Sequence, residues 1–250
     1  MLNLFEALSL AIIQGLTEWF PISSSGHLVI LQQLFGIRAS IAFDVMLHFG
    51  TLFSVIYFLR KDIVKLLKFD EKSRQLAAYI IVGSLPIAIF GLLFKSFFEQ
   101  LFSSLFVVSF ALLINGIILY LTKFSKPKRR VKLSDAIMIG LAQVFSLIPG
   151  ISRSGITISL ALMRKVDKKE AYKFSFLLSI VAIFGTSFLK FGEIDFHQEP
   201  IEIVLVGVLV SALVGYFTLK LIAKSVIEGG FYKFAYYCWL IGVLTLFLAL

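Results

Sequence analysis

The sequence has little of what a water-soluble domain or a disulfide-stabilised domain needs. Only 16% of its 250 residues are charged, whereas 59% are hydrophobic, and the mean hydropathy is +0.95. A soluble domain of this length would require far more polar surface, so the composition predicts an integral membrane protein. The single cysteine, Cys238, excludes an internal disulfide and any metal cluster built on several cysteines.

The sequence also lacks segments of alternating apolar and polar residues, the pattern of a transmembrane β-barrel. Its apolar runs are long and unbroken, which predicts an all-α protein. We expect six spans, each close to the ~20 residues that a bilayer requires. Residues 1–20 are not expected to be a cleavable signal, because they lack a basic start and carry Glu6. The six predicted spans are 43–59, 77–94, 104–122, 174–192, 203–223 and 232–250.

Two further apolar stretches, 4–30 and 134–163, are interrupted in the middle by Pro, Gly and Ser. We expect each to form a re-entrant helical hairpin rather than a continuous span. Non-helical backbone at membrane depth persists only where protein or a wet cavity satisfies its polar groups. Each break is therefore a candidate functional site.

The net charge of +9 is concentrated in short loops, which is typical of cytoplasmic loops rather than of a nucleic-acid-binding surface. The loops 60–74, 123–132 and 164–173 are rich in Lys and Arg, whereas 190–202 has four acidic residues and one basic residue. We expect the first three inside and the last outside, in a multi-pass protein of the plasma membrane. The first hairpin then lies on the outer side and the second on the cytoplasmic side.

The two halves of the chain carry related motifs. "SSSG" at 23–26 matches "SRSG" at 152–155, each at the break of a hairpin. We expect one membrane domain, 1–250, made of pseudo-repeats at about 1–122 and 134–250. Each half has one hairpin and three spans, and because three is odd the second half is inverted, as in many transporters.

The hairpin breaks precede helices, and helix starts attract anions. Ser23 or Ser24 can cap one helix and Ser152 the other. Free N–H groups and the helix dipole make each start an anion site, and Arg153 adds a planar cationic fork that suits phosphate. A buried arginine needs a partner, either a ligand phosphate or Glu18, and a purely structural Arg–Glu pair is the alternative.

Gln14 and Glu18 share one helix face, so Glu18 can hold a divalent cation or act as a base. His27, on the next helix, has the chemistry of a nucleophile or a proton-transfer group. Asp44 and His48 form a second i, i+4 pair, which either supports the site or only stabilises the start of a span. Such a site requires a phosphate-bearing ligand that reaches the middle of a membrane, and a lipid phosphate or diphosphate fits.

These motifs identify a family. "QGLTEWFPISSSGH" resembles the glutamate–serine–histidine motif of the undecaprenyl-diphosphate phosphatases, the bacitracin-resistance family, and "PGISRSGIT" resembles their second motif. The resemblance covers essentially the whole chain. It implies hydrolysis of undecaprenyl diphosphate to undecaprenyl phosphate and inorganic phosphate, assisted by Mg²⁺ or Ca²⁺, at a site open to the outer side. This reaction recycles the lipid carrier of cell-wall synthesis.

The resemblance also assigns residues. It places metal ligands at Gln14 and Glu18, and Gln14 stands where many members have glutamate, which removes one anionic ligand. Val181 stands where proline is usual. The expected catalytic residues are Glu18, Ser24, His27 and Arg153; the expected substrate-binding residues are Ser23, Ser25, Ser152, Ser154 and Thr157.

Several alternatives stay open. The nucleophile can be Ser24, His27 or water. A flippase for lipid phosphate, or an anion transporter, would use the same inverted repeat but needs only Arg153 and the helix dipoles. The expected partners are the polyprenyl substrate and membrane lipids, and a homodimer remains an open assembly state.

Overall fold

The computed structural model describes residues 2–68, 70–193, 197 and 199–250. Regular secondary structure in this part of the chain is helical, which confirms the all-α prediction. The described residues form twelve α-helices: α1 (Leu4–Thr17), α2 (Ser24–Phe35), α3 (Ile41–Phe58), α4 (Arg60–Leu66), α5 (Glu71–Leu93), α6 (Lys95–Leu101), α7 (Leu105–Leu121), α8 (Leu133–Gln143), α9 (Arg153–Met163), α10 (Lys168–Lys190), α11 (Ile201–Glu228) and α12 (Phe234–Ala249).

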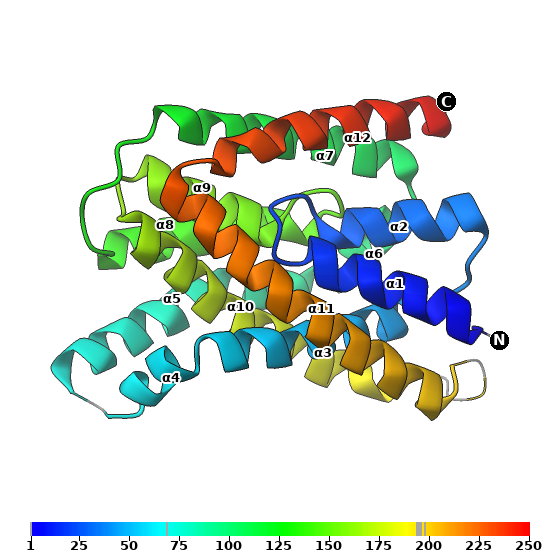
Figure 1. The fold of residues 1–250 in the computed structure, drawn as a ribbon, viewed down its shortest axis with the longest axis horizontal. Helices are drawn as coiled ribbons and strands as arrows, with labels where there is room; N and C mark the ends of the chain where they lie inside the picture. The colour runs from blue at the N-terminus through cyan, green and yellow to red at the C-terminus, as the bar shows by residue number, and fades with distance from the viewer. Residues whose placement is uncertain (1, 69, 194–196, 198) are drawn as a thin grey trace.

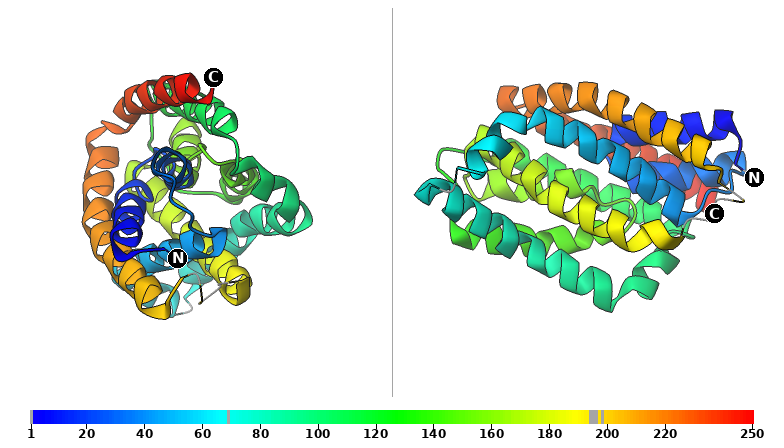
Figure 2. Two further views of the ribbon diagram at one scale, coloured as in Figure 1. Left: turned by 90° about the vertical axis from the view of Figure 1, so that its right-hand side faces the viewer. Right: turned by 90° about the horizontal axis from the view of Figure 1, so that it is seen from below.

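Six of these helices are long and apolar enough to cross a membrane, namely α3, α5, α7, α10, α11 and α12. They correspond to the six predicted spans and lie side by side along the long axis of the molecule (Figure 2). Their outer surface suits lipid. On α11, Leu209, Leu213 and Phe217 recur every four residues and are each more than half exposed, a stripe that hydrocarbon accommodates and water does not. The chain is therefore a multi-pass membrane protein.

The two interrupted stretches form helical hairpins, as their breaks predict. α1 has 14 residues and α2 has 12, so they extend only about 21 and 18 Å at 1.5 Å per residue. The hydrocarbon core is about 30 Å thick, and neither helix can cross it. α8 and α9 are shorter still, with 11 residues each. The two hairpins point toward each other from opposite ends of the bundle (Figure 1).

The tips of the two hairpins touch at Ser23 and Gly150. Ser23 has φ +68°, in the left-handed region that non-glycine residues rarely adopt. Its Oγ accepts the N–H of Gly26 at 3.2 Å and that of Gly150, in the other hairpin, at 3.0 Å. A Cβ on Gly26 would lie 3.1 Å from the Gly150 backbone, and Gly150 itself has φ +107°. The contact therefore requires glycine on both sides.

Asn115, a fully buried residue of α7, joins both tips. Its Nδ2 donates to the carbonyl oxygen of Pro21 at 2.8 Å, and its Oδ1 accepts the N–H of Ser152 at 3.0 Å. Backbone groups at membrane depth need such partners, because no water is present to replace them. One amide on a neighbouring span thus satisfies backbone groups in both hairpins.

The hairpins lie among the spans, and their packing follows a repeating scheme. Seen from the end that holds the N-terminus, α1 and α2 lie within the ring of longer helices (Figure 2). α1 packs on α11, and α8 packs on α5. In an inverted repeat, α1 and α5 of the first half correspond to α8 and α11 of the second half. The packing of α1 on α11 then corresponds to the packing of α8 on α5. The inverted repeat, and its division at about 1–122 and 134–250, stay predictions.

The loop before α8 is fastened to the second hairpin by a buried carboxylate. Asp135 is fully buried, and its two oxygens accept hydrogen bonds from both Nη groups of Arg129, at 2.5 and 2.9 Å. Arg164, just after α9, donates from Nε at 2.6 Å. This cluster ties both outer ends of the hairpin to the loop that connects the two halves.

Candidate functional site

The carboxylate of Glu18 lies at the centre of the polar cluster where the hairpin tips meet. Glu18 follows the last residue of α1 and is 6% exposed. Its Oε2 accepts a hydrogen bond from Ser24 Oγ at 2.5 Å and one from Gln14 Nε2 at 3.0 Å. Its Oε1 forms an ion pair with Arg153 of the second hairpin. Residues from both hairpins thus share one carboxylate.

Ser24 and Arg153 each occupy the first position of a helix. Ser24 begins α2 after the cap residue Ser23, and Arg153 begins α9 after the cap residue Ser152. The positive ends of both helix dipoles are therefore directed at the cluster. The equivalent motifs "SSSG" and "SRSG" explain this placement, since each supplies a capping serine and a glycine at the third helical position.

Glu18 is one of the two partners that the sequence predicted for a buried Arg153, the other being a ligand phosphate. An unpaired charge at this depth would be expensive, and the ion pair removes that cost. The guanidinium stays 17% exposed on its side chain, so an incoming anion can reach it. The Arg153–Glu18 ion pair by itself fits both a structural role and a role in binding. Which role it has must be judged from the chemistry of the neighbouring side chains.

The Glu18 cluster also contains an imidazole, that of His48 on α3. His48 Nε2 lies 3.3 Å from Glu18 Oε2 and 3.4 Å from Ser24 Oγ. Its Nδ1 lies 2.8 Å from the carbonyl oxygen of Asp44; because a carbonyl can only accept, Nδ1 carries a proton. Nε2 therefore faces both the Glu18 carboxylate and the Ser24 hydroxyl: with a proton it donates to the carboxylate, and without one it can accept the proton of the hydroxyl. The sequence left His48 with two readings, and the structure places it at the site.

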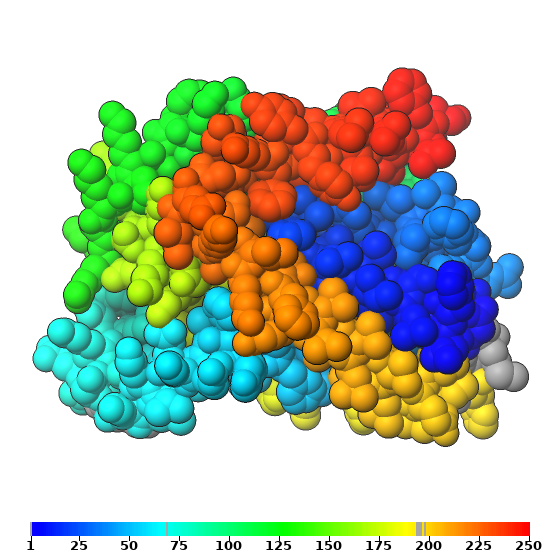
Figure 3. Space-filling view, viewed as in Figure 1, coloured from blue at the N-terminus to red at the C-terminus, as the bar shows by residue number. Residues whose placement is uncertain are grey.

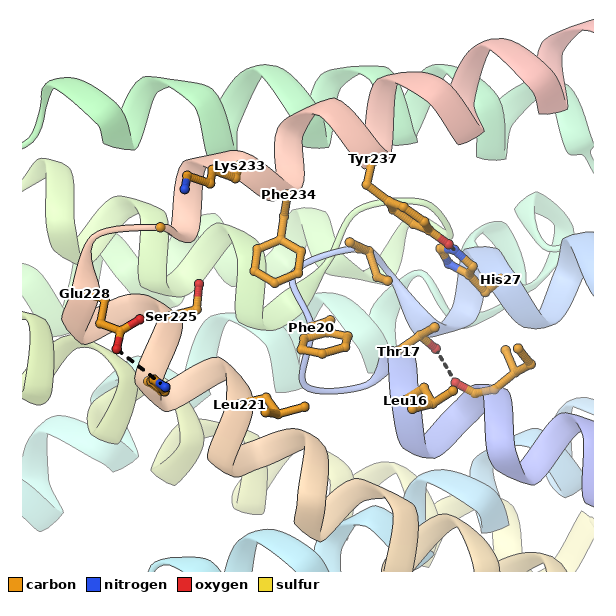
Figure 4. Close-up of a pocket in the computed structure, with 14 residues that line it drawn as sticks. Leu16, Thr17, Phe20, His27, Leu221, Ser225, Glu228, Lys233, Phe234 and Tyr237 are labelled. Atoms are coloured by element: carbon orange, nitrogen blue, oxygen red, sulfur yellow. Dashed lines mark hydrogen bonds and ion pairs between the residues drawn. The ribbon is translucent and has the colours of Figure 1, made fainter.

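His27 also lies at the tip of the first hairpin, but it does not face the Glu18 cluster. Its Nδ1 lies 2.7 Å from the carbonyl oxygen of Ser23 and its Nε2 lies 2.9 Å from the Tyr237 hydroxyl, with the two rings stacked. Nδ1 therefore donates and Nε2 accepts the tyrosine proton. His27 and Tyr237 together border a pocket between α1, α11 and α12 (Figure 4). Among the described residues, the contacts of His27 do not include Glu18 or Arg153, and its catalytic role stays a prediction.

The expected substrate-binding hydroxyls are mostly engaged within the protein. Ser152 caps α9 by accepting the N–H of Gly155 at 3.0 Å, and Ser154 Oγ lies 3.1 Å from Ser152 Oγ. Thr157 donates to the Arg153 carbonyl oxygen at 2.7 Å. Ser25 is half-buried and lies 3.3 Å from Ser23 through its hydroxyl, which makes it the most accessible of the set. Their roles in binding substrate stay predictions.

Gln14 leaves one oxygen unused. Its Oε1 is buried and has no hydrogen-bond partner among the described residues, while its amide donates to Glu18. An orphaned oxygen beside a carboxylate is a donor set that a hard divalent cation accepts. The described part of the chain contains no group of three or more His, Cys, Asp or Glu arranged to hold a metal. Any cation here would take its other ligands from elsewhere.

Two contributors to the site are not signalled by any motif. Asn115 binds both hairpin tips from α7, and Tyr237 binds His27 from α12. Asn115 is the only amide in α7, whereas Tyr237 is one of two adjacent tyrosines in α12, so no local pattern distinguishes it. A polar side chain inside the membrane predicts a partner but does not say which one.

The fold and the cluster define a class: a multi-pass helical membrane protein in which two broken hairpins bring a carboxylate, a serine, an imidazole and an arginine to one buried point. The chain belongs to the family of the bacitracin resistance protein BacA, whose model matches residues 7–244. This confirms the family that the two hairpin motifs indicated.

Proteins similar to this chain over nearly their whole length include an undecaprenyl-diphosphatase of Halothermothrix orenii, 40% identical over 99% of both chains. An undecaprenyl-diphosphatase of Korarchaeum cryptofilum is 38% identical over 98% of this chain and 99% of its own. Undecaprenyl-diphosphatase 3 of Bacillus cereus is 38% identical over 99% of this chain and 98% of its own.

Proposed function

We propose that this chain is an undecaprenyl-diphosphate phosphatase, which hydrolyses undecaprenyl diphosphate to undecaprenyl phosphate and inorganic phosphate. The observation that carries this is the carboxylate of Glu18, shared between the hydroxyl of Ser24 and the guanidinium of Arg153. The names of the relatives favour this hydrolysis over a flippase or an anion transporter. The reaction recycles the lipid carrier for cell-wall synthesis and confers bacitracin resistance, as the family description suggests.

Binding begins at Arg153 and the two helix starts. A diphosphate carries more charge than Glu18 and accepts both arms of the guanidinium fork, so it competes for Arg153. The dipoles of α2 and α9 add to the attraction. A transporter would need no more than this, whereas a hydrolase also needs a nucleophile and a proton acceptor beside the phosphate.

Ser24 is the nucleophile in this proposal. Its Oγ attacks the terminal phosphorus, the bond from that phosphorus to the bridging oxygen breaks, and undecaprenyl phosphate leaves with the bridging oxygen. The proton of Ser24 passes to the pair formed by Glu18 and His48, whose acceptor atoms lie 2.5 and 3.4 Å from Oγ. Proton transfer to a positioned group of this kind typically contributes about 10²–10⁴-fold in rate.

A water molecule completes the reaction. It attacks the phosphoserine at phosphorus, the bond between phosphorus and Oγ breaks, and inorganic phosphate leaves. The Glu18–His48 pair returns its proton to Ser24 Oγ as that oxygen leaves. The proton lost by the attacking water passes to an oxygen of the departing inorganic phosphate, so the site returns to its starting state. Arg153 binds the developing charge on the phosphate oxygens in both steps.

His27 acts on this reaction through the backbone. Its Nδ1–H donates to the carbonyl oxygen of Ser23 at 2.7 Å, and Ser23 holds the left-handed φ of +68° directly before the nucleophile. Strained backbone of this kind persists only when its surroundings fix it. Loss of His27 would therefore misplace Ser24 without removing any group that touches phosphate.

A divalent cation, Mg²⁺ or Ca²⁺, would bind Glu18 and the free Oε1 of Gln14. When bound, it would neutralise charge that develops on the diphosphate oxygens. Glutamine supplies a neutral oxygen where glutamate would supply a charged one, so we expect weaker cation binding than a glutamate at this position would give.

The site opens to the outer side of the plasma membrane in this proposal. The basic loops 60–74, 123–132 and 164–173 mark the cytoplasmic end by the positive-inside rule. The first hairpin, which carries Glu18 and Ser24, then enters from the outside. Labelling of cysteines introduced in 123–132 of intact cells by an impermeant reagent from the outside would contradict this orientation.

Phosphate release from purified protein tests the function. Farnesyl or undecaprenyl diphosphate is supplied with Mg²⁺, and inorganic phosphate is measured over time. We expect turnover by the wild type and a loss of about a hundredfold or more in Ser24→Ala. Ser9→Ala is the matched control and should retain full activity, because the Ser9 hydroxyl donates within α1, to the Phe5 carbonyl oxygen, and has no other hydrogen bond among the described residues.

Rapid quenching with ³²P-labelled substrate distinguishes the nucleophiles. We expect an acid-stable phosphoserine at Ser24 that is absent from Ser24→Ala. An acid-labile phosphohistidine at His27 would assign the attack to the imidazole, and no covalent label in either would favour direct attack by water. Lipid movement between leaflets without phosphate release would favour a flippase.

A further inference from the structure

The pocket that His27 and Tyr237 border is separate from the Glu18 cluster and has two distinct parts. It has a volume of about 660 Å³ and lies between α1, α11 and α12. Its walls are apolar and include Leu16, Phe20 and Leu221 (Figure 4). In the space-filling view the first hairpin reaches the surface between α11 and α12 (Figure 3), so the pocket faces the surrounding lipid rather than the interior of the bundle.

The end of the pocket away from His27 is basic. Lys224, near the end of α11, and Lys233, in the turn before α12, both line it and are both exposed. Lys224 pairs loosely with Glu228 at 3.8 Å, with both side chains more than 60% exposed. Such a pair contributes little. The ammonium of Lys233 has no ion-pair partner in the described part of the chain.

Further basic residues surround this rim. The ammonium of Lys123 lies 5.5 Å from the ring centroid of Tyr232, next to Lys233 in sequence. Lys168 donates to the carbonyl oxygen of Ile227 at the end of α11 at 3.0 Å. Lys123 belongs to the basic loop 123–132, so the rim lies at the end of the bundle that carries the excess positive charge.

We propose that this pocket binds an anionic phospholipid from the leaflet on the side of the basic loops. Its headgroup phosphate lies between Lys224 and Lys233, and one acyl chain runs along the apolar wall toward Tyr237 and His27. The positive charge of the rim is the reason for choosing an anionic lipid, because basic pockets between membrane helices attract anionic headgroups. The hydrocarbon wall alone would accept the chain of any lipid. Glu228 is the acidic residue at the rim, and a phosphate would replace it as the partner of Lys224.

The site does not depend on the proposed hydrolysis, since none of these lysines belongs to the Glu18 cluster. It differs from a substrate site by its position: the charged rim lies at the opposite end of the pocket from the hairpin tip that carries Ser24 and His27. A lipid bound with its phosphate at the rim cannot place that phosphate at Ser24.

Lipid selectivity measured on the full-length protein tests the proposal. The protein is placed in nanodiscs of phosphatidylglycerol and phosphatidylcholine, and the ratio of the two lipids retained on extraction is counted by native mass spectrometry. We expect retention of phosphatidylglycerol over phosphatidylcholine by the wild type. We expect Lys224→Gln/Lys233→Gln to lower this selectivity about tenfold, because each lysine near a membrane surface contributes separately to binding of anionic lipid.

The matched control is Lys65→Gln/Lys220→Gln, which removes the same charge from exposed residues outside the pocket. It should keep the wild-type selectivity. An equal loss in both double variants would attribute the selectivity to general surface charge and overturn the proposal. Equal retention of both lipids by the wild type would overturn it as well.

A photo-reactive phosphatidylglycerol, with a diazirine at the end of one acyl chain, locates the bound lipid. We expect cross-links to Phe20, Phe234 or Tyr237, and we expect Leu221→Trp, which fills the pocket without changing its charge, to remove them. Cross-links confined to other helices would overturn the proposal. Displacement of the label by farnesol, at equal yield in the lysine variants, would show that an uncharged prenyl chain occupies the pocket instead.

Discussion

His48 Nε2 lies 3.3 Å from Glu18 Oε2, and this contact joins the first span to the break of the first hairpin. The imidazole contacts one oxygen of the carboxylate, Oε2, whereas Arg153 contacts the other, Oε1. The hydroxyl of Ser24 lies within reach of both the carboxylate and the imidazole. The proposed nucleophile therefore has two proton acceptors and a cation around it, all held by different helices.

Removal of this imidazole should slow the chemistry without weakening binding. We expect His48→Ala to lower kcat for phosphate release by about a hundredfold, within the usual range for a lost proton-transfer group, and to leave KM within about threefold. Steady-state kinetics on the purified variant measure both. His197→Ala is the histidine control, because His197 lies beyond the end of α10 in the acidic loop 190–202. An unchanged kcat in His48→Ala would remove His48 from the mechanism.

The guanidinium of Arg153 should matter for its shape as well as its charge. Arg153→Lys keeps the cation but loses the planar fork, which matches carboxylate and phosphate through two parallel hydrogen bonds. We expect kcat/KM for the diphosphate to fall by about a hundredfold, the size of one lost charge-assisted hydrogen bond. Arg74→Lys, on the exposed start of α5, should leave kcat/KM unchanged; equal values for the two variants would speak against fork recognition.

Much of this architecture could be predicted from the sequence, because the number and position of the spans depend on the length of the apolar runs. Each span was expected wherever about 20 apolar residues occur together, and each helix is present. The limits are less accurate: 203–223 was expected where the helix runs Ile201–Glu228. The apolar criterion ends at the membrane boundary, whereas the hydrogen-bonded backbone continues into the interface with Lys224 and Glu228.

Some residues of the site could be predicted from the sequence and others could not. Glu18, Ser24 and Arg153 were expected together because they belong to paired motifs at chain breaks, and the structure brings them together. Asn115 and Tyr237 could not be expected. Their contacts depend on which spans lie beside the hairpin tips, and that is decided by packing between distant helices, not by any local pattern.

Restoring a carboxylate at Gln14 should strengthen the dependence on cation. Gln14→Glu replaces the free neutral oxygen with a charged one beside Glu18. Because hard cations prefer charged oxygen ligands, we expect the Mg²⁺ concentration for half-maximal phosphate release to fall by about tenfold. Titration of Mg²⁺ into EDTA-treated protein measures it. Gln33→Glu, at the exposed end of α2, is the control, and a higher Mg²⁺ requirement in Gln14→Glu would contradict the assigned ligand.

Asn115 should matter more for stability than any other single amide in the spans. Asn115→Ala leaves the N–H of Ser152 without a partner in a buried site and leaves the carbonyl oxygen of Pro21 with only the weak Cys238 thiol donor, 3.7 Å away. Each unsatisfied buried group costs about 1–3 kcal/mol, so we expect a loss of about 2–6 kcal/mol. The apparent Tm in detergent measures this loss. Gln75→Ala, which removes one exposed hydrogen bond to Tyr79, should change the Tm by little; a similar small change in Asn115→Ala would argue against the bridging role.

The buried Asp135 carboxylate gives a prediction about pH, because it lies outside the six spans. Burial raises the pKa of Asp135, but hydrogen bonds from Arg129 and Arg164 outweigh burial and hold its pKa at about 2, below the ordinary 3.8. A carboxyl whose pKa is lower in the folded state stabilises the fold above its unfolded pKa. That stability is lost as the pH falls from about 4 toward 2.

Replacement of this carboxyl should therefore be costly at neutral pH and less costly in acid. Asp135→Asn leaves Arg129 and Arg164 without their anionic partner. It should destabilise the protein by about 3 kcal/mol, or about 6–12 °C in apparent Tm. The difference from wild type should be the same at pH 7 and pH 5 and should shrink between pH 4 and pH 2. Asp62→Asn, which breaks the more exposed pair with Lys173, should cost less than about 1 kcal/mol. A difference for Asp135→Asn that stayed constant down to pH 2 would mean that the ion pairs with the two arginines do not hold this hairpin in place.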